Sequence, residues 1–323
     1  MSEPHSSNSE THSHKTLWER DTLERLAFAT LAEQRASRRW RIFFRMAWLL
    51  IAALLLWTGL HKGSMGGGNP SQPHTAVIAI KGEIADGADA SAEWVVTALR
   101  AAFEDEGSQA VVLQINSPGG SPVQAGIIND EIRRLKEKHK KPVYAVVEES
   151  CASAAYYIAV AADEIYVDKA SIVGSIGVLM DGFGFTGLMD KLGVERRLMT
   201  AGVNKGFLDP FSPQTKNQRA HAQTLLDQIH QQFIQVVRDG RGKRLKETPE
   251  LFSGLFWSGE QAVNLGLADG LGNLDYVARE IVKAEDVIDY TRHENVAERL
   301  AKRFGAAIGE GAVRALQTMP VVR

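Results

Sequence analysis

Segments with strand and helix patterns alternate through the middle of the chain, and this alternation limits the possible folds more than any other feature. The short apolar runs typical of strands are residues 76–80, 110–115, 143–147 and 164–167. The segments with helical patterns between them are residues 91–106, 122–140 and 154–162. Strands that alternate with helices form layered α/β folds with a largely parallel sheet. An α/β domain is therefore predicted, and it starts at residue 75.

The second half of the chain carries three further helix patterns. A long helix is predicted over 217–239, where apolar residues recur in register. Ser258 is a plausible N-cap for a short helix, and residues 275–284 also favour a helix. The domain is predicted to span 75–285, and residues 286–323 form an amphipathic C-terminal extension whose structure the sequence specifies only weakly.

Residues 42–60 form a 19-residue apolar run that only Arg45 interrupts. As a helix this run reaches roughly 28 Å, close to the hydrocarbon thickness of a bilayer. A buried core helix and a cleaved signal peptide are the alternatives. The signal peptide is disfavoured because about 41 residues precede the run and no convincing A-x-A site follows it. A single transmembrane anchor is therefore predicted.

Basic residues cluster before the apolar run, whereas Lys62 alone follows it closely. The positive-inside rule then places residues 1–41, a partly disordered segment, in the cytoplasm. Residues 61–74 are rich in glycine and read as a flexible linker. In a bacterium this pattern predicts a single-pass protein of the inner (cell) membrane with a periplasmic or extracytoplasmic domain.

Composition excludes several other classes of protein. The net charge of −2 and the apolar content of 44% give no sign of a nucleic-acid partner. Cys151 is the one cysteine, which excludes an intrachain disulfide framework and a cysteine-based zinc site. The nine histidines show neither HxxxH nor HExxH spacing, so we expect no metal site and no cofactor.

Ser153 stands among small residues, between the predicted strand 143–147 and the helix 154–162. Small neighbours let a substrate backbone approach the serine oxygen, and the start of a helix supplies unpaired N–H groups beside it. We therefore interpret Ser153 as a nucleophile. Cys151 is an alternative nucleophile, but it has no obvious base, and a buried structural thiol is the better interpretation.

Two glycine-containing turns could assist Ser153. Residues 115–122 (INSPGGSP) join a strand to a helix, and the N–H groups of their glycines could form an oxyanion hole. An ordinary glycine turn explains that segment equally well. Ser175, in the turn VGSIGV, could orient a nearby side chain, although a plain turn serine is the simpler interpretation.

Lys205 is the candidate base. It lies in a glycine-rich loop, residues 200–211, with apolar and aromatic neighbours, and burial favours the neutral amine that a base requires. A solvated surface lysine is the alternative. A Ser–His–Asp triad is disfavoured because His139, His221 and His230 all lie on predicted helices and no GxSxG motif is present.

Five motifs in order carry a family resemblance: NSPGGSP, CASAAYYIA, GSIGV, AGVNKGFLDPF and FWSGEQAVNLGLADGLG. From about Thr75 to Ala284 the chain resembles the bacterial serine–lysine signal peptide peptidase A family, in its short, single-domain, membrane-anchored form. The resemblance implies a ClpP/crotonase-like fold of repeated β-β-α units. It also implies Ser153 as nucleophile, Lys205 as general base and Ser175 as the residue that orients the lysine.

The same resemblance implies an oxyanion hole formed by Gly120 and the N–H of Ala154. It further implies a ring of subunits that share the dyad, and hydrophobic peptide substrates such as remnant signal peptides. The chain departs from the family at Ala154-Ala155, where Gly-Gly is usual. A crotonase-type acyl-CoA enzyme and a non-catalytic membrane scaffold are the alternative functions, although the former would normally lack an anchor.

Overall fold

The computed structural model describes residue 40, residues 42–54 and residues 72–292. These belong to two units, divided between Met65 and Gly66. In the first unit residues 42–54 are helical, and Trp48 and Leu50 are exposed. No helix of the described ranges is long and apolar enough to cross a membrane. Residues 55–60 of the predicted anchor, like residues 1–39, 61–71 and 293–323, lie outside the described residues, so the transmembrane anchor stays a prediction.

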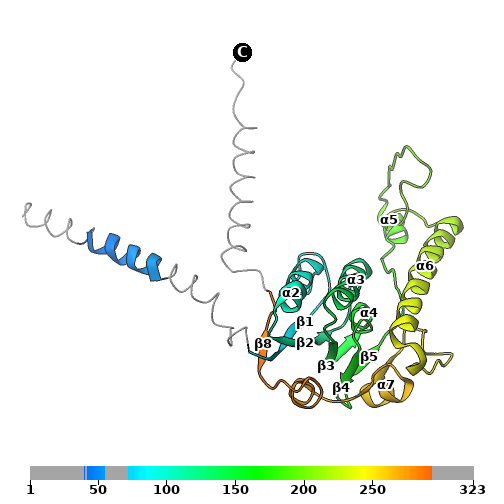
Figure 1. The fold of residues 1–323 in the computed structure, drawn as a ribbon. Coiled ribbons are helices and arrows are strands. Elements are labelled where there is room, and N and C mark those ends of the chain that lie inside the picture. Colours follow the sequence, from blue (N-terminus) through cyan, green and yellow to red (C-terminus); the bar gives the residue numbers. More distant parts are fainter. Residues whose placement is uncertain (1–39, 41, 55–71, 293–323) are drawn as a thin grey trace, which may run out of the picture. The chain divides into compact units, whose positions relative to one another are not determined.

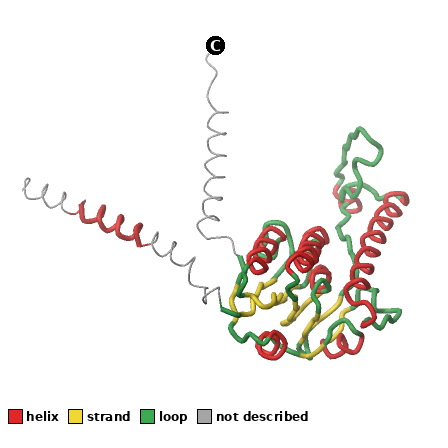
Figure 2. The backbone as a smooth tube through the Cα atoms, in the orientation of Figure 1, coloured by secondary structure: helices red, strands yellow, loops and turns green. Residues whose placement is uncertain are grey.

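The second unit is built on a mixed sheet (Figures 1 and 2). Its strands are β1 (His74–Lys81), β2 (Ser108–Ser117), β3 (Val143–Ala152), β4 (Glu164–Val167), β5 (Ile172–Gly174), β6 (Phe256–Ser258), β7 (Gly270–Leu271) and β8 (Val287–Asp289). The main order is β6-β5-β3-β2-β1-β8, and β4 pairs with β3 and β7. Only the β5–β6 pairing is antiparallel among the described strands. The predicted α/β fold with a largely parallel sheet is confirmed.

Helices connect the strands. They are α2 (Ala92–Glu104), α3 (Pro122–His139), α4 (Ala154–Ala159), α5 (Thr186–Leu192), α6 (Lys216–Arg241), α7 (Gly259–Leu265) and α8 (Leu274–Tyr276), with a 3₁₀ turn η1 (Gly242–Arg244) and a π-helical segment η2 (Val277–Val282). Figure 1 shows α2, α3 and α4 together on one side of the strands and the α8–η2 segment on the other.

Both faces of the central strands are buried. Ile78 of β1 and Leu113 of β2 lie in the core beneath α2 and α3, whereas the preceding residues, Val77 and Val112, pack with Val277 of η2. The side chains of successive strand residues point to opposite faces of the sheet. In a strand that is covered on both faces, both sets of side chains are therefore buried and apolar. This explains why the strands read as continuous apolar runs.

The boundaries differ from the sequence predictions at two instructive places. β3 continues to Ala152, five residues beyond the predicted end at Val147, because Ser150 to Ala152 pair with β5. The helix predicted over 154–162 ends at Ala159. At the end of the domain, β8 pairs in parallel with β1, so the sheet extends past the predicted boundary at residue 285.

One part of the second unit projects from the sheet. Figure 1 shows α5 and the first half of α6 extending away from the strands. α5 has no buried residue, and α6 buries only Phe233, Ile234, Val237 and Arg241, all in its second half. That half is fixed closely: a Cβ on Gly240 would lie 2.2 Å from the Val160 carbonyl oxygen at the end of α4. We call residues 178–226 the arm.

Candidate active site

Ser153 occupies the single position between β3 and α4. It is the N-cap residue of α4, with φ 53° and ψ −122°, and its N–H donates to the Gly174 carbonyl at 2.8 Å. A positive φ is unfavourable for a residue with a Cβ, and such strain persists only where the surroundings enforce it. The continued pairing of β3 with β5 therefore holds Ser153 in a sharp strand-to-helix turn.

The Gly119–Gly120 segment is packed directly against this turn. A Cβ on Gly119 would lie 2.7 Å from the Cβ of Ser153, and one on Gly120 would lie 2.2 Å from the Ile84 carbonyl oxygen. Both residues have positive φ, 107° and 148° respectively. Only glycine fits at either position. The backbone of this segment therefore packs directly against its neighbours, and the segment is not an ordinary flexible turn.

Two N–H groups at the cavity that Ser153 lines have no acceptor among the described residues. The Ile84 carbonyl accepts from the Ser121 N–H, and the Ile84 N–H donates to the Gly119 carbonyl. The N–H of Gly120, between these two residues, takes part in neither bond. Ala154 is the first residue of α4, where a helix N–H has no partner in the preceding turn. Within the described chain no carbonyl accepts a hydrogen bond from either N–H. Both residues can therefore offer a donor to a substrate oxygen, and the oxyanion hole stays a prediction.

A cavity of about 580 Å³ opens beside Ser153. Of the residues predicted from the sequence, it brings together Gly120, Ser153, Ala154 and Ser175. Most of its other walls are apolar: Pro118, Pro122, Tyr157, Val178, Leu179, Ile229 and Phe233. The cavity is therefore suited to an apolar chain whose backbone lies near Ser153.

The Ser175 turn is also strained and closely packed. Ser175 has φ 52°, and its N–H donates to the Leu255 carbonyl at 2.8 Å. Its own carbonyl accepts from Gly177 N–H at 2.9 Å, and a Cβ on Gly177 would lie 3.0 Å from the Cα of Gly254. Ser175 is thus held at the cavity edge by defined contacts on both sides.

Lys205, the candidate base, lies in the arm and not at the Ser153 cavity. It is exposed in the turns of residues 201–208, where its N–H donates to the Gly202 carbonyl at 3.1 Å. It is absent from the residues that line the Ser153 cavity. A single copy of the chain, as far as it is described, therefore does not bring Lys205 and Ser153 together.

The structure also describes the surroundings of the alternative nucleophile, Cys151, and of the three histidines that could act as bases. Cys151 is fully buried in β3, and burial raises the pKa of its thiol, which disfavours the reactive thiolate. The interpretation of Cys151 as a buried thiol is confirmed. His139, His221 and His230 do not line the cavity, but the Nε2 of His230 lies 3.1 Å from the Ile176 carbonyl oxygen. No sequence pattern predicts that contact, which joins segments 54 residues apart.

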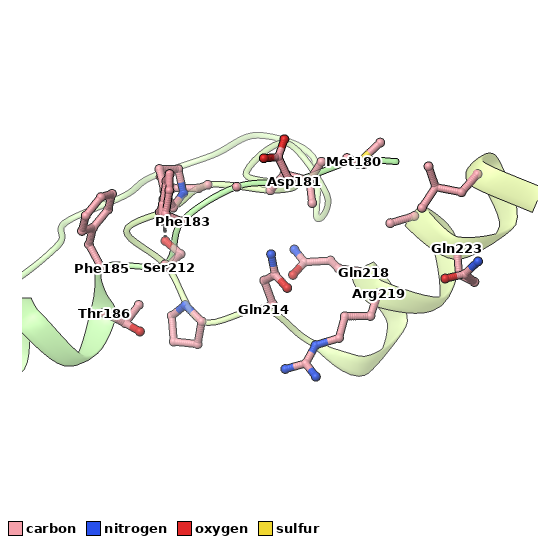
Figure 3. Close-up of a pocket in the computed structure, with 18 residues that line it drawn as sticks. Met180, Asp181, Phe183, Phe185, Thr186, Ser212, Gln214, Gln218, Arg219 and Gln223 are labelled. Carbon is pink, nitrogen blue, oxygen red and sulfur yellow. Dashed lines mark hydrogen bonds between the residues drawn. The ribbon is translucent and has the colours of Figure 1, made fainter. Parts of the chain in front are cut away.

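A second, larger hollow lies in the arm. Figure 3 shows it between the loop that carries Met180 to Phe185 and the first turns of α6, which carry Gln218, Arg219 and Gln223. Its volume is about 930 Å³, and Ser153 takes no part in it. The rings of Phe185 and Phe211 stack at 5.4 Å beside it. The two sides of the arm are also joined by the hydrogen bond from Phe185 N–H to the Pro210 carbonyl at 2.8 Å and by the ion pair of Arg196 with Asp209 at 3.5 Å.

Comparison with known proteins shows the family of this chain. Residues 135–288, which include Ser153, Ser175 and Lys205, match the model of peptidase family S49. A protein of Methanocaldococcus jannaschii named as a putative protease is 32% identical over 222 residues, which cover 67% of this chain and 71% of that protein. The chain belongs to peptidase family S49. Its α/β sheet fits the ClpP-like fold of that family.

Two further relatives match the chain over only part of their own length. A putative signal peptide peptidase of Enterococcus faecium is 30% identical to this S49 chain over 61% of the chain and 57% of its own length. A Brucella melitensis protein named Na(+)/H(+) antiporter NhaA is 44% identical over 67% of the chain. The match spans only 27% of that antiporter, so its name describes a much longer protein.

Proposed function

We propose that the chain is a membrane-anchored serine endopeptidase that uses a Ser–Lys dyad. The observation that carries the proposal is the placement of Ser153. Ser153 lies in a strained turn and lines a cavity with several apolar walls. Gly120 and Ala154, whose N–H groups have no acceptor in the described chain, line the same cavity. Pre-positioned donors of this kind stabilise the negative charge that develops on a carbonyl oxygen during acyl transfer.

The reaction follows from these groups. Neutral Lys205 accepts the hydroxyl proton of Ser153 while the serine oxygen attacks a peptide carbonyl carbon. The carbonyl oxygen becomes an oxyanion, which accepts hydrogen bonds from the N–H groups of Gly120 and Ala154. The C–N bond then breaks, the leaving amine takes the proton, and an acyl-enzyme ester remains. Water, deprotonated by the same lysine, hydrolyses the ester and restores Ser153.

We propose that Lys205 reaches Ser153 from a neighbouring copy of the chain in a homo-oligomeric ring, with Ser175 orienting it there. Two features support this. Lys205 does not line the cavity of its own chain. The arm around it exposes large apolar side chains: Leu179 by 82%, Phe183 by 81%, Met199 by 94% and Val203 by 98%. Exposed apolar surface on this scale marks an interface.

The proposed substrates are hydrophobic peptides, such as remnant signal peptides. The apolar walls of the Ser153 cavity support this, because burial of a leucine-like side chain there contributes about 1.5–3 kcal/mol. The proposed location is the bacterial inner membrane, with residues 42–60 as the anchor, residues 1–41 in the cytoplasm and the catalytic domain outside the cytoplasm. The cluster of basic residues before the apolar run supports this orientation.

The dyad is tested with a fluorophosphonate probe, which labels activated serines. The full chain is compared with Ser153→Ala and Lys205→Ala, and with Lys138→Ala as a matched control on the exposed side of α3. Labelling of the wild type and of Lys138→Ala alone is expected. Equal labelling of Ser153→Ala would show that another residue reacts. Absence of labelling in all four proteins would instead favour a scaffold or an acyl-CoA enzyme.

A further inference from the structure

Helix α6 supplies one wall of the Ser153 cavity. Ile229, Gln232 and Phe233 line that wall. This part of the helix is fixed on the domain, because Phe233 and Val237 are buried and the rings of Tyr157 and Phe233 lie 5.2 Å apart. A side chain from this stretch of α6 can therefore hold a neighbouring loop in a defined place.

His230 lies in the middle of this stretch and contacts the Ser175 turn. Its imidazole is half-buried, and its Nε2 lies 3.1 Å from the Ile176 carbonyl oxygen. A carbonyl oxygen only accepts hydrogen bonds, so Nε2 carries the proton and donates. The Ile176 side chain is fully buried, so residue 176 is held both by its side chain and by its carbonyl.

The turn needs such a contact because its backbone is unfavourable. Ser175 has φ 52° without being glycine, and the turn is closed by a bond between residues only two apart, Gly177 N–H to the Ser175 carbonyl. A turn of this kind relaxes readily unless neighbouring groups hold it. Relaxation would move the Ser175 hydroxyl away from the cavity that Ser175 and Gly177 both line.

We propose that His230 is a positioning residue of the active site, which holds the Ser175–Gly177 turn through the Ile176 carbonyl. It acts neither as a base nor on the substrate. The consequence for catalysis rests on the proposed function, in which Ser175 orients the catalytic lysine. The hold on the turn itself does not depend on that function, and the two are tested separately.

The first test measures hydrogen exchange of residues 174–178 in the full chain. His230→Leu removes the donor, His230→Gln keeps an N–H at similar reach, and Gln231→Leu is the control at an exposed neighbouring position of α6. Loss of one hydrogen bond should speed exchange in His230→Leu by roughly tenfold, with no change in the other two variants. The same rate in all four proteins would overturn the proposal, whether or not the chain is active.

The second test measures peptide cleavage per serine titrated with the fluorophosphonate probe. His230→Leu should lower kcat by roughly tenfold, and His230→Gln should restore it. The double variant Ser175→Ala, His230→Leu should be no slower than Ser175→Ala, because both changes act on the same step. Additive losses would contradict action through Ser175. A wild type without labelling would refute the proposed function, and the exchange rates would still decide the role of His230.

Discussion

Four residues around the site have a positive φ: the serines Ser153 and Ser175, and the glycines Gly119 and Gly120. Each is held by contacts with segments far away in the sequence, such as the bond from Ser153 N–H to Gly174 and the approach of Gly119 to Ser153. At the two serines this conformation costs about 1–3 kcal/mol each, and it is maintained only where the surrounding structure is rigid. The site is therefore preorganised before any substrate binds.

Gly119→Ala tests this packing at the scale of one methyl group. The added Cβ would lie 2.7 Å from the Cβ of Ser153 and 2.8 Å from the Ala152 carbonyl oxygen, so the turn must shift. We expect a loss of about 1–3 kcal/mol in the free energy of unfolding, and loss of probe labelling at Ser153. Thermal unfolding and labelling rates measure the two effects.

Gly126→Ala, within α3, is the matched control, because a Cβ there meets no atom within 4 Å. It should raise the free energy of unfolding by about 0.5–1 kcal/mol, since alanine favours a helix interior over glycine, and leave labelling unchanged. Equal behaviour of the two alanine variants would mean that Gly119 has no special role.

The role of Ser153 as a candidate nucleophile was predictable from its small neighbours and its place between strand and helix. The conformations of Ser153 and Ser175 were not, because no local pattern places a serine at positive φ. The contact of His230 with Ile176 was equally hidden, since the histidine lies on a regular helix and its partner is a backbone atom. Every residue has a backbone carbonyl, so the residue type at position 176 does not indicate that its carbonyl accepts a hydrogen bond.

At the scale of elements, the pairing between α2 and α3 has an electrostatic part. Glu131 of α3 accepts from Arg134 Nε and from Arg100 Nε of α2, both at 2.7 Å. The hydrogen bond from Arg134, together with Arg100, lowers the pKa of the Glu131 carboxyl to about 2, from an ordinary value of 4.5. The charged carboxylate is therefore more favourable in the folded chain than in the unfolded one.

This lowered pKa sets the sign of a pH effect. The contribution of Glu131 is present above pH 4.5 and is lost as the pH falls toward 2. We expect the loss to be about 1 kcal/mol, because both guanidinium groups are half exposed and water screens them. Urea unfolding of the wild type and Glu131→Gln between pH 2 and pH 7 measures it. Parallel curves for the two proteins would contradict the assignment.

The long elements of the sheet and its cover were predictable, and the short ones were not. The strands β1 to β4 contain apolar runs, and the helices α2, α3 and α6 contain helical periodicities, that are long enough to predict the element from the sequence. β5 to β8 have two or three residues each and exist only through pairing with distant strands. The last residues of β3 include Glu148, Glu149 and Ser150, whose polarity concealed a strand that continues to Ala152, the residue before Ser153.

At the scale of the whole molecule, the candidate site is divided between the sheet and the arm. Ser153 and the two N–H donors belong to the sheet and its loops, whereas Lys205 lies on an exposed turn of the arm. The apolar surface of the arm is large and has no cover in the described chain. The central claim is therefore that one copy of the chain completes the site of the next.

Complementation between two inactive variants tests this claim most directly. Ser153→Ala and Lys205→Ala carry different tags, are produced together and are purified through both tags, and the product is then labelled with the fluorophosphonate probe. If subunits mix at random in a closed ring, about a quarter of the sites combine an intact serine with an intact lysine from the neighbour. The account predicts labelling at roughly that fraction of the wild-type level, although each variant alone is unlabelled. A mixed assembly without labelling would contradict it.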